Sequence, residues 1–568
     1  MILRALYDYY KRCDNLPVKG LEEKEIGYLI VIKDDGSFLR LESRMKDKKQ
    51  ASRFLVLQTV KRSGKKFVPN YLWDNVEYIF GGPGSSDEKN HTFVKMVSEL
   101  SELKPDSKTI AAIKEFYANV KVNVPVVMED PLWSEMQKSN KNISFLIEGE
   151  TKIAAENKDV WNLVLYQKSN DIQKHCLVSS EKGYVARLHS TIKLTKDTGP
   201  IVSFQKGKGY DSYGKEQAYN APISEEAEFA YTTALNSLLK KGSRNKFMLG
   251  TRTFVFWASK NNEASMETEE SLFDLLGFSE EANDDPNANL MKVRKVFESI
   301  YSGIMKTGLD DKFYILGLAP NSARIAVVYW SETTLKDFAE KILNHFRDME
   351  IQDTRKNKKP YMGLNAIITS VSLQGKIANA TPNLPEAVVK SIFQGLPYPI
   401  SLFQACIRRI RAEVALEKNG KKINPVNILR AAIIKAYLNR NSNNNKKIDI
   451  MLDKDNNNQG YLCGRLFAVL ENLQFAANGQ DSIRSSYMNA ASTTPSTVFS
   501  TILKLSNNHY GKLAKDKKKL ANFFDNQKKE IMAMLQEFPD TLELNDQGRF
   551  FLGYYHQKNY KENNNSEE

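Results

Sequence analysis

The sequence predicts an α+β protein, with a mixed α/β N-terminal region at residues 1–380 and an all-helical bundle at residues 381–568. Before residue 380, short runs rich in Val, Ile, Phe and Tyr are bounded by Gly, Pro, Asn or Asp, as strands are. Beyond it, apolar residues recur at helical spacing. At 568 residues the chain exceeds the size that one core serves, so at least two folding units are expected.

The first elements follow from spacing and turn residues. Apolar side chains at helical spacing predict a short helix within residues 1–16. Residues 27–43 predict a hairpin that turns at Asp34-Asp35-Gly36. Strands at 53–60 and 65–69 are expected around a tight turn at Ser63-Gly64, followed by a helical pattern through 91–120. A sub-boundary is expected near residues 120–140.

Later strands alternate with helices. We expect strands at 143–150, 185–194, 200–204, 252–259 and 312–330, the last a pair around Pro320-Asn321. Ser224 is a predicted N-cap, because Glu225 and Glu226 follow it in the first turn of a helical pattern. Residues 401–418 predict an amphipathic helix, and Pro425 is expected at the first position of the next one.

Composition bounds the class of protein. The 81 Lys and Arg residues exceed the 68 Asp and Glu residues, which leaves a net charge of +13. This excess favours a polyanion as partner, although basic surfaces that only face solvent are common. Four widely spaced cysteines, no signal-like N-terminus and no long apolar run predict reduced thiols in a cytoplasmic protein.

The usual catalytic motifs do not appear in the sequence. The six histidines form no metal-ligand spacing, and no phosphate loop or nucleophile elbow occurs. We therefore expect neither an enzyme nor a cofactor or metal. Asp106, Glu150 and Lys152 are the nearest approach to a carboxylate–carboxylate–lysine nuclease site, but solvated turns explain them better.

Basic side chains cluster in residues 44–66. This stretch contains nine basic residues and a single acidic one, Asp47. Such a bias favours phosphate contact over an inert lysine turn. The nine are Arg44, Lys46, Lys48, Lys49, Arg53, Lys61, Arg62, Lys65 and Lys66.

Two further segments combine charge with other nucleic-acid features. Residues 203–224 contain Lys206, Lys208 and Lys215 beside glycines, with tyrosines that either stack on bases or pack the loop down. Arg408, Arg409 and Arg411 occupy the side of their helix away from Phe403. That face suits a strand-binding groove, an acidic partner or plain solvent.

Several stretches resemble a known family. They include MILRALYDYY, FVPNYLWDN, SYGKEQAYNAPIS, FYILGLAPNSARIAVVYW, PYPISLFQACIRRIRAE, GYLCGRLFAVLE and LGYYHQ, in colinear order to about residue 557. Together they resemble the large subunit of the type I-C CRISPR surveillance complex, Cascade. The family loop carries small and acidic residues where this chain has Lys206 and Lys208.

The resemblance implies a non-catalytic role in antiviral defence. Such subunits recognise the protospacer-adjacent motif on duplex DNA, promote opening and guide pairing, and help to recruit a helicase–nuclease. The implied partners are guide RNA-bound backbone subunits, a guide-processing subunit, small helical subunits, target double-stranded DNA and the helicase–nuclease. The alternatives are a metal-dependent nuclease and a scaffold without base contacts.

We assign candidate contacts on this basis. The expected motif-side residues are Lys61, Arg62, Lys65, Lys66, Asn70 and Asn75, and Pro69 is expected to turn the Asn70 amide outward. The expected phosphate contacts are Lys46, Lys48, Lys49, Arg53, Lys206, Lys208, Tyr213 and Asn220. Arg408, Arg409 and Arg411 are expected to contact a strand or a subunit, and Trp73 is expected to be buried.

Residues 451–568 form a candidate second product. In the resembling family, small helical subunits are translated from an internal start in the large-subunit gene. Met451 precedes the last helical patterns and would start such a unit, whereas Met488 would cut through it. Alternatively, both are ordinary methionines.

Overall fold

The protein was analysed as a computed structural model, which describes residues 2–13, 15–47, 50–59, 67–82, 85–165, 172–194, 197–207, 211–249, 251–276, 288–355, 363–418, 421–441, 447–479 and 482–560. The described elements are mixed α and β up to about residue 380 and helical beyond it, apart from the ribbon of β15 (Glu417–Lys418) and β16 (Lys421–Lys422). The predicted α+β class is confirmed.

The chain forms two compact units. Unit 1 comprises Met1–Arg12, His189–Ser203 and Leu235–Glu568, and unit 2 comprises Cys13–Leu188 and Phe204–Ala234. This division rests on compactness, whereas the predicted boundary at 380/381 rests on a change of secondary structure. The boundary and the separate unit 451–568 therefore stay predictions.

Unit 2 contains a four-stranded mixed sheet in the order β3-β2-β6-β5. Strand β2 (Tyr28–Ile32) forms the predicted hairpin with β3 (Phe38–Ser43), and it pairs in parallel with β6 (Ile143–Ile147). The two-residue β5 (Trp73–Asp74) pairs with the other edge of β6. Every residue of β2 and β6 is buried, so this sheet is the centre of the unit.

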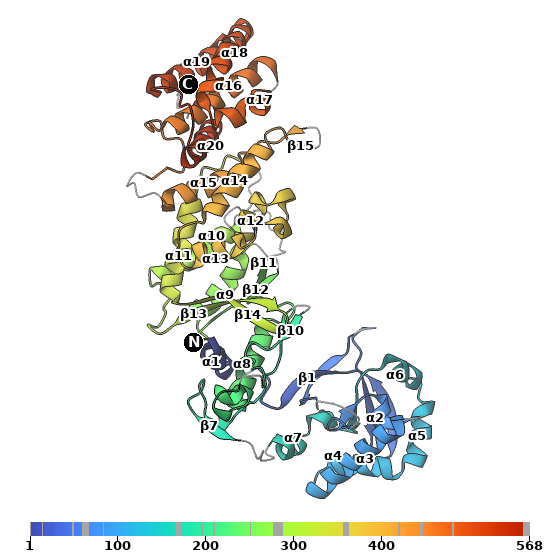
Figure 1. Cartoon of the computed structure of the whole chain (residues 1–568). Coiled ribbons are helices and arrows are strands. Elements are labelled where there is room, and N and C mark those ends of the chain that lie inside the picture. The colour runs from blue at the N-terminus through green and yellow to red at the C-terminus, as the bar shows by residue number, and fades with distance from the viewer. Residues whose placement is uncertain are drawn as a thin grey trace. The chain divides into compact units, whose positions relative to one another are not determined.

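Helices cover this sheet (Figure 1). A separate two-stranded ribbon is formed by the strands that precede and follow the β2–β3 hairpin in the chain. The core contains Ile30, Phe93, Ile113, Phe116 and Phe145. The ribbon pairs β1 (Leu21–Ile26) with β4 (Ser52–Leu57). The helices are α2 (Val76–Phe80), α3 (Ser85–Leu103), α4 (Lys108–Ala118), α5 (Val120–Glu129), α6 (Trp133–Ser139) and α7 (Lys158–Leu165).

Unit 1 contains a four-stranded antiparallel sheet in the order β11-β12-β13-β14. Its strands are β11 (Lys246–Leu249), β12 (Arg252–Ala258), β13 (Lys312–Asn321) and β14 (Arg324–Thr334). Phe254, Phe256 and Phe313 belong to the core that is shared with α9 (Glu263–Leu275), α10 (Ala288–Tyr301) and α11 (Leu335–Met349). The alternation of side chains along β12 therefore gives the sheet one face that is covered by helices.

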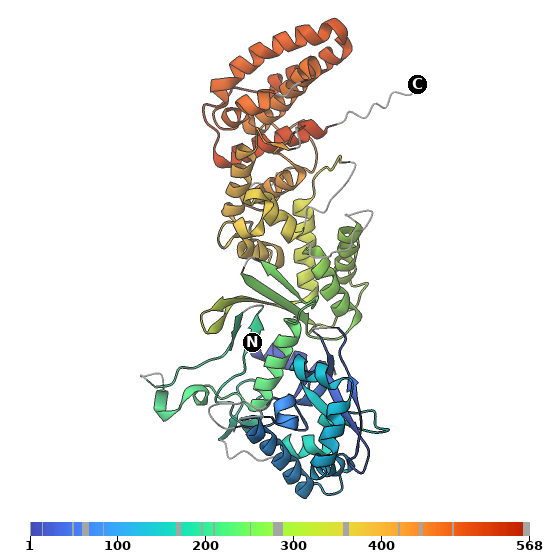
Figure 2. The same cartoon turned by 90° about the vertical axis from the view of Figure 1, so that its right-hand side faces the viewer.

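Helix α1 (Ile2–Arg12) lies on the opposite face of this sheet (Figures 1 and 2). The Tyr9 ring meets the Trp257 ring edge-on, with centroids 6.4 Å apart. Trp257 in turn contacts Tyr314 and Trp330, whose rings stack on each other. Arg12 donates to the carbonyl of Ala258 at 2.7 Å. The predicted N-terminal helix is thus a structural cover of the sheet.

The C-terminal helices surround one buried helix. Helix α16 (Gln459–Asn478) contacts α17 (Ser482–Ala491), α18 (Pro495–Asp516), α19 (Lys518–Met534) and α20 (Leu544–Asn559) (Figure 1). A Cβ added at Gly464 would lie 1.9 Å from the carbonyl oxygen of Phe550, and one at Gly553 would lie 2.1 Å from that of Tyr461. The glycines therefore let α16 and α20 approach backbone to backbone.

The remaining described helices connect the sheet of unit 1 to this bundle. They are α12 (Leu364–Val371), α13 (Leu384–Phe393), α14 (Ile400–Ala412) and α15 (Ile428–Asn441). Gly548 of α20 lies against Phe403 of α14 and Ile434 of α15, so the bundle continues the core of these helices. Among the described helices, none is both long and apolar enough to cross a membrane.

Some predicted elements are wrong. Residues 67–69 and 200–204 form no strand, and within 185–194 the only named strand is β9 (Ile192–Leu194), which pairs with β10 (Asp197–Gly199). Pro425 does not begin α15, because Asn427 caps the helix by accepting from the N–H of Arg430 at 3.1 Å. Ser224, in contrast, is confirmed as the cap of α8 (Glu225–Leu238), since its Oγ accepts from Ala227 at 3.2 Å.

Candidate nucleic-acid interface

The chain from Phe67 to Asn75 forms a turn that is fixed in unit 2 by a buried carboxylate. The backbone and side-chain N–H groups of Asn70 both donate to Oδ2 of Asp74, at 2.9 and 3.0 Å. Oδ1 of Asp74 accepts from the backbone of Asn75 at 2.9 Å. Because Asn70 and Asp74 are only 3% and 2% exposed, these bonds lie out of water and hold the turn firmly.

Aromatic and aliphatic side chains anchor the same turn. Trp73 is 1% exposed, which confirms its predicted burial, and Phe67 is half-buried against the core of unit 2. Leu72 is fully buried with a φ of +60°, a left-handed conformation that costs a non-glycine residue energy. Burial, with Glu99 nearby, raises the pKa of Tyr71, so its phenol stays neutral.

The structure corrects one prediction for this turn. Asn70 does not turn its amide outward, because Asp74 binds that amide inside the protein. Asn75 also has a structural contact: its Oδ1 caps α2 by accepting from the N–H of Tyr78 at 3.3 Å. Lys61, Arg62, Lys65 and Lys66 lie outside the described residues, so the structure places the segment that follows them but not the four side chains.

Acidic residues outside residues 44–66 pair with two basic side chains of the cluster. Arg53 forms an ion pair of 3.7 Å with Glu23, which reaches it across the β1–β4 ribbon. Arg44 pairs with Glu42 at 2.8 Å. The excess of basic residues within 44–66 therefore overstates the local positive charge, because Glu23 and Glu42 lie outside that stretch of sequence. Lys46 is exposed, and Lys48 and Lys49 lie outside the described residues.

Among the described residues of the loop 204–220, Tyr213 presents its ring to solvent. Tyr213 is 97% exposed, so the alternative that this tyrosine packs the loop down is excluded. Lys206 forms an ion pair of 3.0 Å with Glu216. The side-chain amide of Asn220 donates to the carbonyl of Lys215 at 2.6 Å, so Asn220 braces the loop. Lys208 lies outside the described residues.

The three arginines of α14 differ from one another. Only Arg408 is exposed. Arg409 donates to Glu413 at 3.1 Å, and Arg411 donates to Gln547 of α20 at 2.8 Å. Burial lowers the pKa of Arg411. The predicted solvent-facing row is therefore corrected to one exposed arginine and two that hold the fold.

Glu413 explains why Arg409 faces inward. Burial by itself would raise the pKa of Glu413, but hydrogen bonds from Arg430 and Arg409 lower it. The ion pair of Arg430 with Glu413 is 2.6 Å long, and the Arg430 side chain is nearly inaccessible. The α14 C-terminus is therefore tied to α15 by a charge cluster that the sequence pattern of α14 does not reveal.

The nuclease-like residues lie at the surface of the protein. Asp106, Glu150 and Lys152 are all exposed. Across the described ranges, no three His, Cys, Asp or Glu side chains gather as metal ligands would. The interpretation of these residues as solvated turn positions agrees with this placement.

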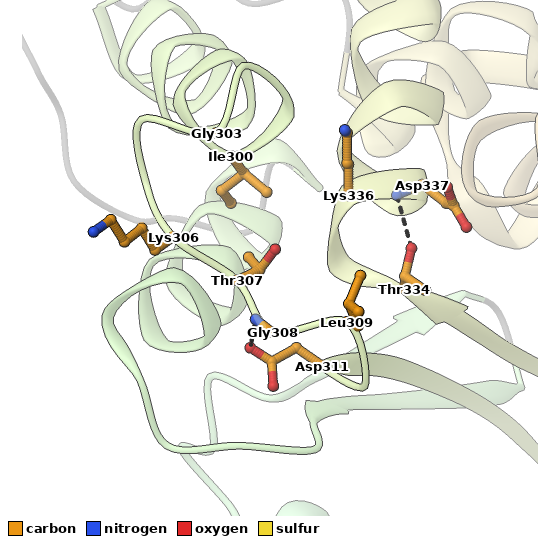
Figure 3. Close-up of a pocket in the computed structure, with 10 residues that line it drawn as sticks. All are labelled: Ile300, Gly303, Lys306, Thr307, Gly308, Leu309, Asp311, Thr334, Lys336 and Asp337. Atoms are coloured by element: carbon orange, nitrogen blue, oxygen red, sulfur yellow. Dashed lines mark hydrogen bonds between the residues drawn. The ribbon is translucent and has the colours of Figure 1, made fainter.

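One open pocket lies at the end of the sheet in unit 1 (Figure 3). It has a volume of about 470 Å³ and lies between the loop that follows α10 and the first turn of α11. Oδ2 of Asp311 accepts from the N–H of Gly308 at 2.7 Å, and the backbone N–H of Asp337 donates to Oγ1 of the N-cap Thr334 at 3.1 Å. Lys306 extends away from the other lining residues in Figure 3.

Sequence reasoning missed the residues that position the candidate contacts. Asp74 was not singled out, although Asn70 and Asp74 are four residues apart in a short aromatic segment. Asp211 and Glu216 were also missed, and their spacing around Tyr213 is the available signal. Acidic residues inside a basic, glycine-containing loop are good candidates for loop anchors, because a carboxylate accepts several backbone N–H bonds.

Comparison with known proteins defines the class. A family profile described as CRISPR-associated protein (Cas_Csd1) matches residues 6–560, which is nearly the whole chain. A search of the curated proteins found no match. The match makes this chain a CRISPR-associated protein. More specifically, it belongs to the Cas_Csd1 family, the large subunits of type I-C Cascade.

Proposed function

We propose that this chain reads the protospacer-adjacent motif of duplex DNA within its Cascade complex, promotes duplex opening for guide pairing, and helps to recruit a separate helicase–nuclease. It performs these steps without catalysis of its own. Its proposed partners are the guide RNA-bound backbone subunits, the guide-processing subunit, small helical subunits, target duplex DNA and the helicase–nuclease.

The observation that carries this proposal is the Asp74-anchored turn. A protein that reads DNA must hold its contact residues in a fixed position, because loosely held side chains lose selectivity. The turn of Phe67–Asn75 is held by Asp74 and by the buried Trp73. It directly follows the basic stretch of residues 61–66 in the chain. A rigid turn directly after a cationic segment supports a role in motif reading.

The proposed division of labour follows from the chemistry. Lys61, Arg62, Lys65 and Lys66 supply cationic donors for the motif side, where amides and lysines suit the acceptors of the minor groove. Exposed basic side chains such as Lys46 supply phosphate contacts, which position the protein without reading sequence. In this refined proposal Asn70 is a positioning residue, because its amide holds the turn.

A charge-removal variant tests the proposal in the assembled complex. Lys61, Arg62, Lys65 and Lys66 are changed together to Ala, and binding to a motif-bearing target duplex is measured by fluorescence anisotropy. The matched control removes four exposed lysines of the same unit, Lys108, Lys114, Lys121 and Lys138. We expect the first variant to assemble on guide RNA but to lose target binding, while the control binds as wild type does.

This experiment and a cleavage assay separate the two alternatives. If the chain is only a scaffold, the four-residue variant will fail to assemble or will bind the target normally. If it is a metal-dependent nuclease, the purified chain will cut DNA with Mg²⁺ or Mn²⁺, and Asp106→Ala will abolish cutting. We expect no cutting by either protein.

A further inference from the structure

Tyr213 is held out into solvent in a strained conformation. Its φ is +54°, and that of Gly214 is +69°, so two consecutive residues adopt the left-handed conformation. This conformation is rare for a bulky side chain and costs energy. At 97% exposed, the ring also gives up the stabilisation of burial. Within the described ranges, the next most exposed aromatic side chain is Phe475, at 58%.

The loop is braced on both sides of this ring. Before Tyr213, Asp211 accepts from the N–H of Gly207 at 2.8 Å and from the N–H of Gln217 at 3.3 Å. After it, Asn220 donates to the carbonyls of Lys215 and Gln217. These bonds join the two flanks across the tip, so the exposure of Tyr213 is built into the loop.

A second brace involves charge. Glu216 forms ion pairs with Arg187 at 3.2 Å and with Lys206 at 3.0 Å. The two acids of this loop, Asp211 and Glu216, are therefore directed at the N–H groups and cations of the protein. Lys215 is exposed, two residues after Tyr213. The exposed tip thus combines an aromatic ring with a cation.

The space around the tip suits a flexible chain of flat groups. A Cβ placed on Gly214 would have no atom within 4 Å, so another backbone can approach this side of the loop. Nucleic-acid bases stack on exposed tyrosine rings irrespective of sequence, and a neighbouring lysine contacts the phosphate. A pocket on a protein partner would also accept a tyrosine, but the exposed cation beside the ring favours a polyanion.

We propose that Tyr213 stacks on a base of the target DNA where the first pairs beside the motif separate, and so stabilises the opened duplex. This inference rests on the proposed function and assigns one of its steps to a single residue. It replaces the predicted phosphate contact of Tyr213 by a base contact. Lys215 is the proposed phosphate contact at the same tip.

The test compares two DNA substrates in the complete guide-bound complex. One is a fully paired, motif-bearing duplex with 2-aminopurine beside the motif, and the other has its first pairs already mismatched. Stacking of one base on an aromatic ring is worth about 1–3 kcal/mol, which corresponds to about a 5- to 150-fold change in affinity. We expect Tyr213→Ala to lose that much on both substrates, because the same stacked base is lost from the opened state, and to reduce the 2-aminopurine signal only on the paired duplex, where the bases must still separate.

Conservative and unrelated variants complete the design. Tyr213→Phe keeps the ring and should bind and open the duplex as wild type does. Tyr301→Ala removes another exposed tyrosine and should have no effect. Normal opening by Tyr213→Ala, an unchanged affinity for both DNA substrates, or failure of the complex to assemble would each overturn the inference, and the last would indicate a protein pocket instead.

The outcomes also separate this inference from the proposed function. If the wild-type complex binds duplexes with and without the motif equally, the proposed function fails. If motif selection depends on Lys61, Arg62, Lys65 and Lys66 while Tyr213→Ala opens DNA normally, only the stacking inference fails.

Discussion

Both N–H groups of Asn70, backbone and side chain, donate to a single carboxylate oxygen of Asp74, at 2.9 and 3.0 Å. The second oxygen of Asp74 accepts from Asn75, the N-cap of α2. One buried carboxylate therefore fixes the end of the turn and the start of the next helix. Because β5 ends at Asp74, the same residue also joins this turn to the sheet of unit 2.

We predict that Asp74→Ala destabilises the protein more than Asn70→Ala does. Hydrogen bonds to a charged group are worth about 1.5–3 kcal/mol each, and Asp74→Ala leaves several buried donors without an acceptor. We expect a loss of about 3 kcal/mol or more for Asp74→Ala and about 1–2 kcal/mol for Asn70→Ala, both measured by urea unfolding. A loss of motif selection by Asn70→Ala with unchanged stability would show a direct base contact and contradict the positioning role.

The arginines of α14 should separate into two groups. Arg409 and Arg411 have partners inside the fold, so Arg409→Ala and Arg411→Ala should lower Tm even without nucleic acid. Arg408 is exposed, so Arg408→Ala should leave Tm unchanged and affect only binding to a partner. Thermal unfolding of the three purified variants checks this order. A Tm for Arg408→Ala as low as those of the other two would contradict it.

Glycines in the C-terminal bundle provide a matched pair of tests. Gly464→Ala would place a Cβ 1.9 Å from the carbonyl oxygen of Phe550, so α16 and α20 must move apart. We expect a loss of several kcal/mol, about as large as other overpacked core positions or larger. Gly511→Ala in α18 meets no atom within 4 Å and should stabilise the helix by up to about 1 kcal/mol. Equal effects of both changes would refute the close approach of the helices.

Cys176 predicts a pH dependence of stability. Its Sγ accepts from the backbone N–H groups of Val178, Ser179 and Ser224, at 3.2–3.4 Å. Burial by itself would raise the pKa of this thiol, but the hydrogen bonds from Ser179 and Ser224 lower it to about 7, from an ordinary value of 9.0. The folded protein therefore releases this proton more readily than the unfolded chain does.

The sign of the Cys176 effect follows from that difference. The stabilising contribution of the thiolate is complete above pH 9 and is lost as the pH falls toward 7. The difference in Tm between wild type and Cys176→Ala should thus grow between pH 7 and pH 9 and stay constant below that range. Cys463→Ala is the control, because burial raises the pKa of Cys463 to about 12. A pH-independent difference for Cys176→Ala would contradict this account.

Local patterns predicted the elements that depend on local sequence. The hairpin of β2 and β3, the pair β13–β14, the cap Ser224 and the burial of Trp73 follow from turn residues, alternation and side-chain type. The family resemblance was confirmed by the profile match over residues 6–560.

Relationships between distant residues were beyond local patterns. The pairing of β4 with β1, instead of with a strand at 65–69, brings Glu23 to Arg53 across a large sequence separation. In the same way, Arg411 meets Gln547 only because α20 packs against α14. A window of sequence counts charges, whereas tertiary contacts decide which charges are already paired.

The salt dependence of target binding tests the central claim most directly. The assembled complex, carrying either wild type or the variant of Lys61, Arg62, Lys65 and Lys66, is titrated with duplexes that have or lack the motif at several salt concentrations. The account predicts that the variant loses preference for the motif and that its log–log salt slope falls by about 3–4, because each cationic side chain removed from the DNA groove releases about 0.9 fewer counterions. An unchanged slope together with retained motif preference would contradict it.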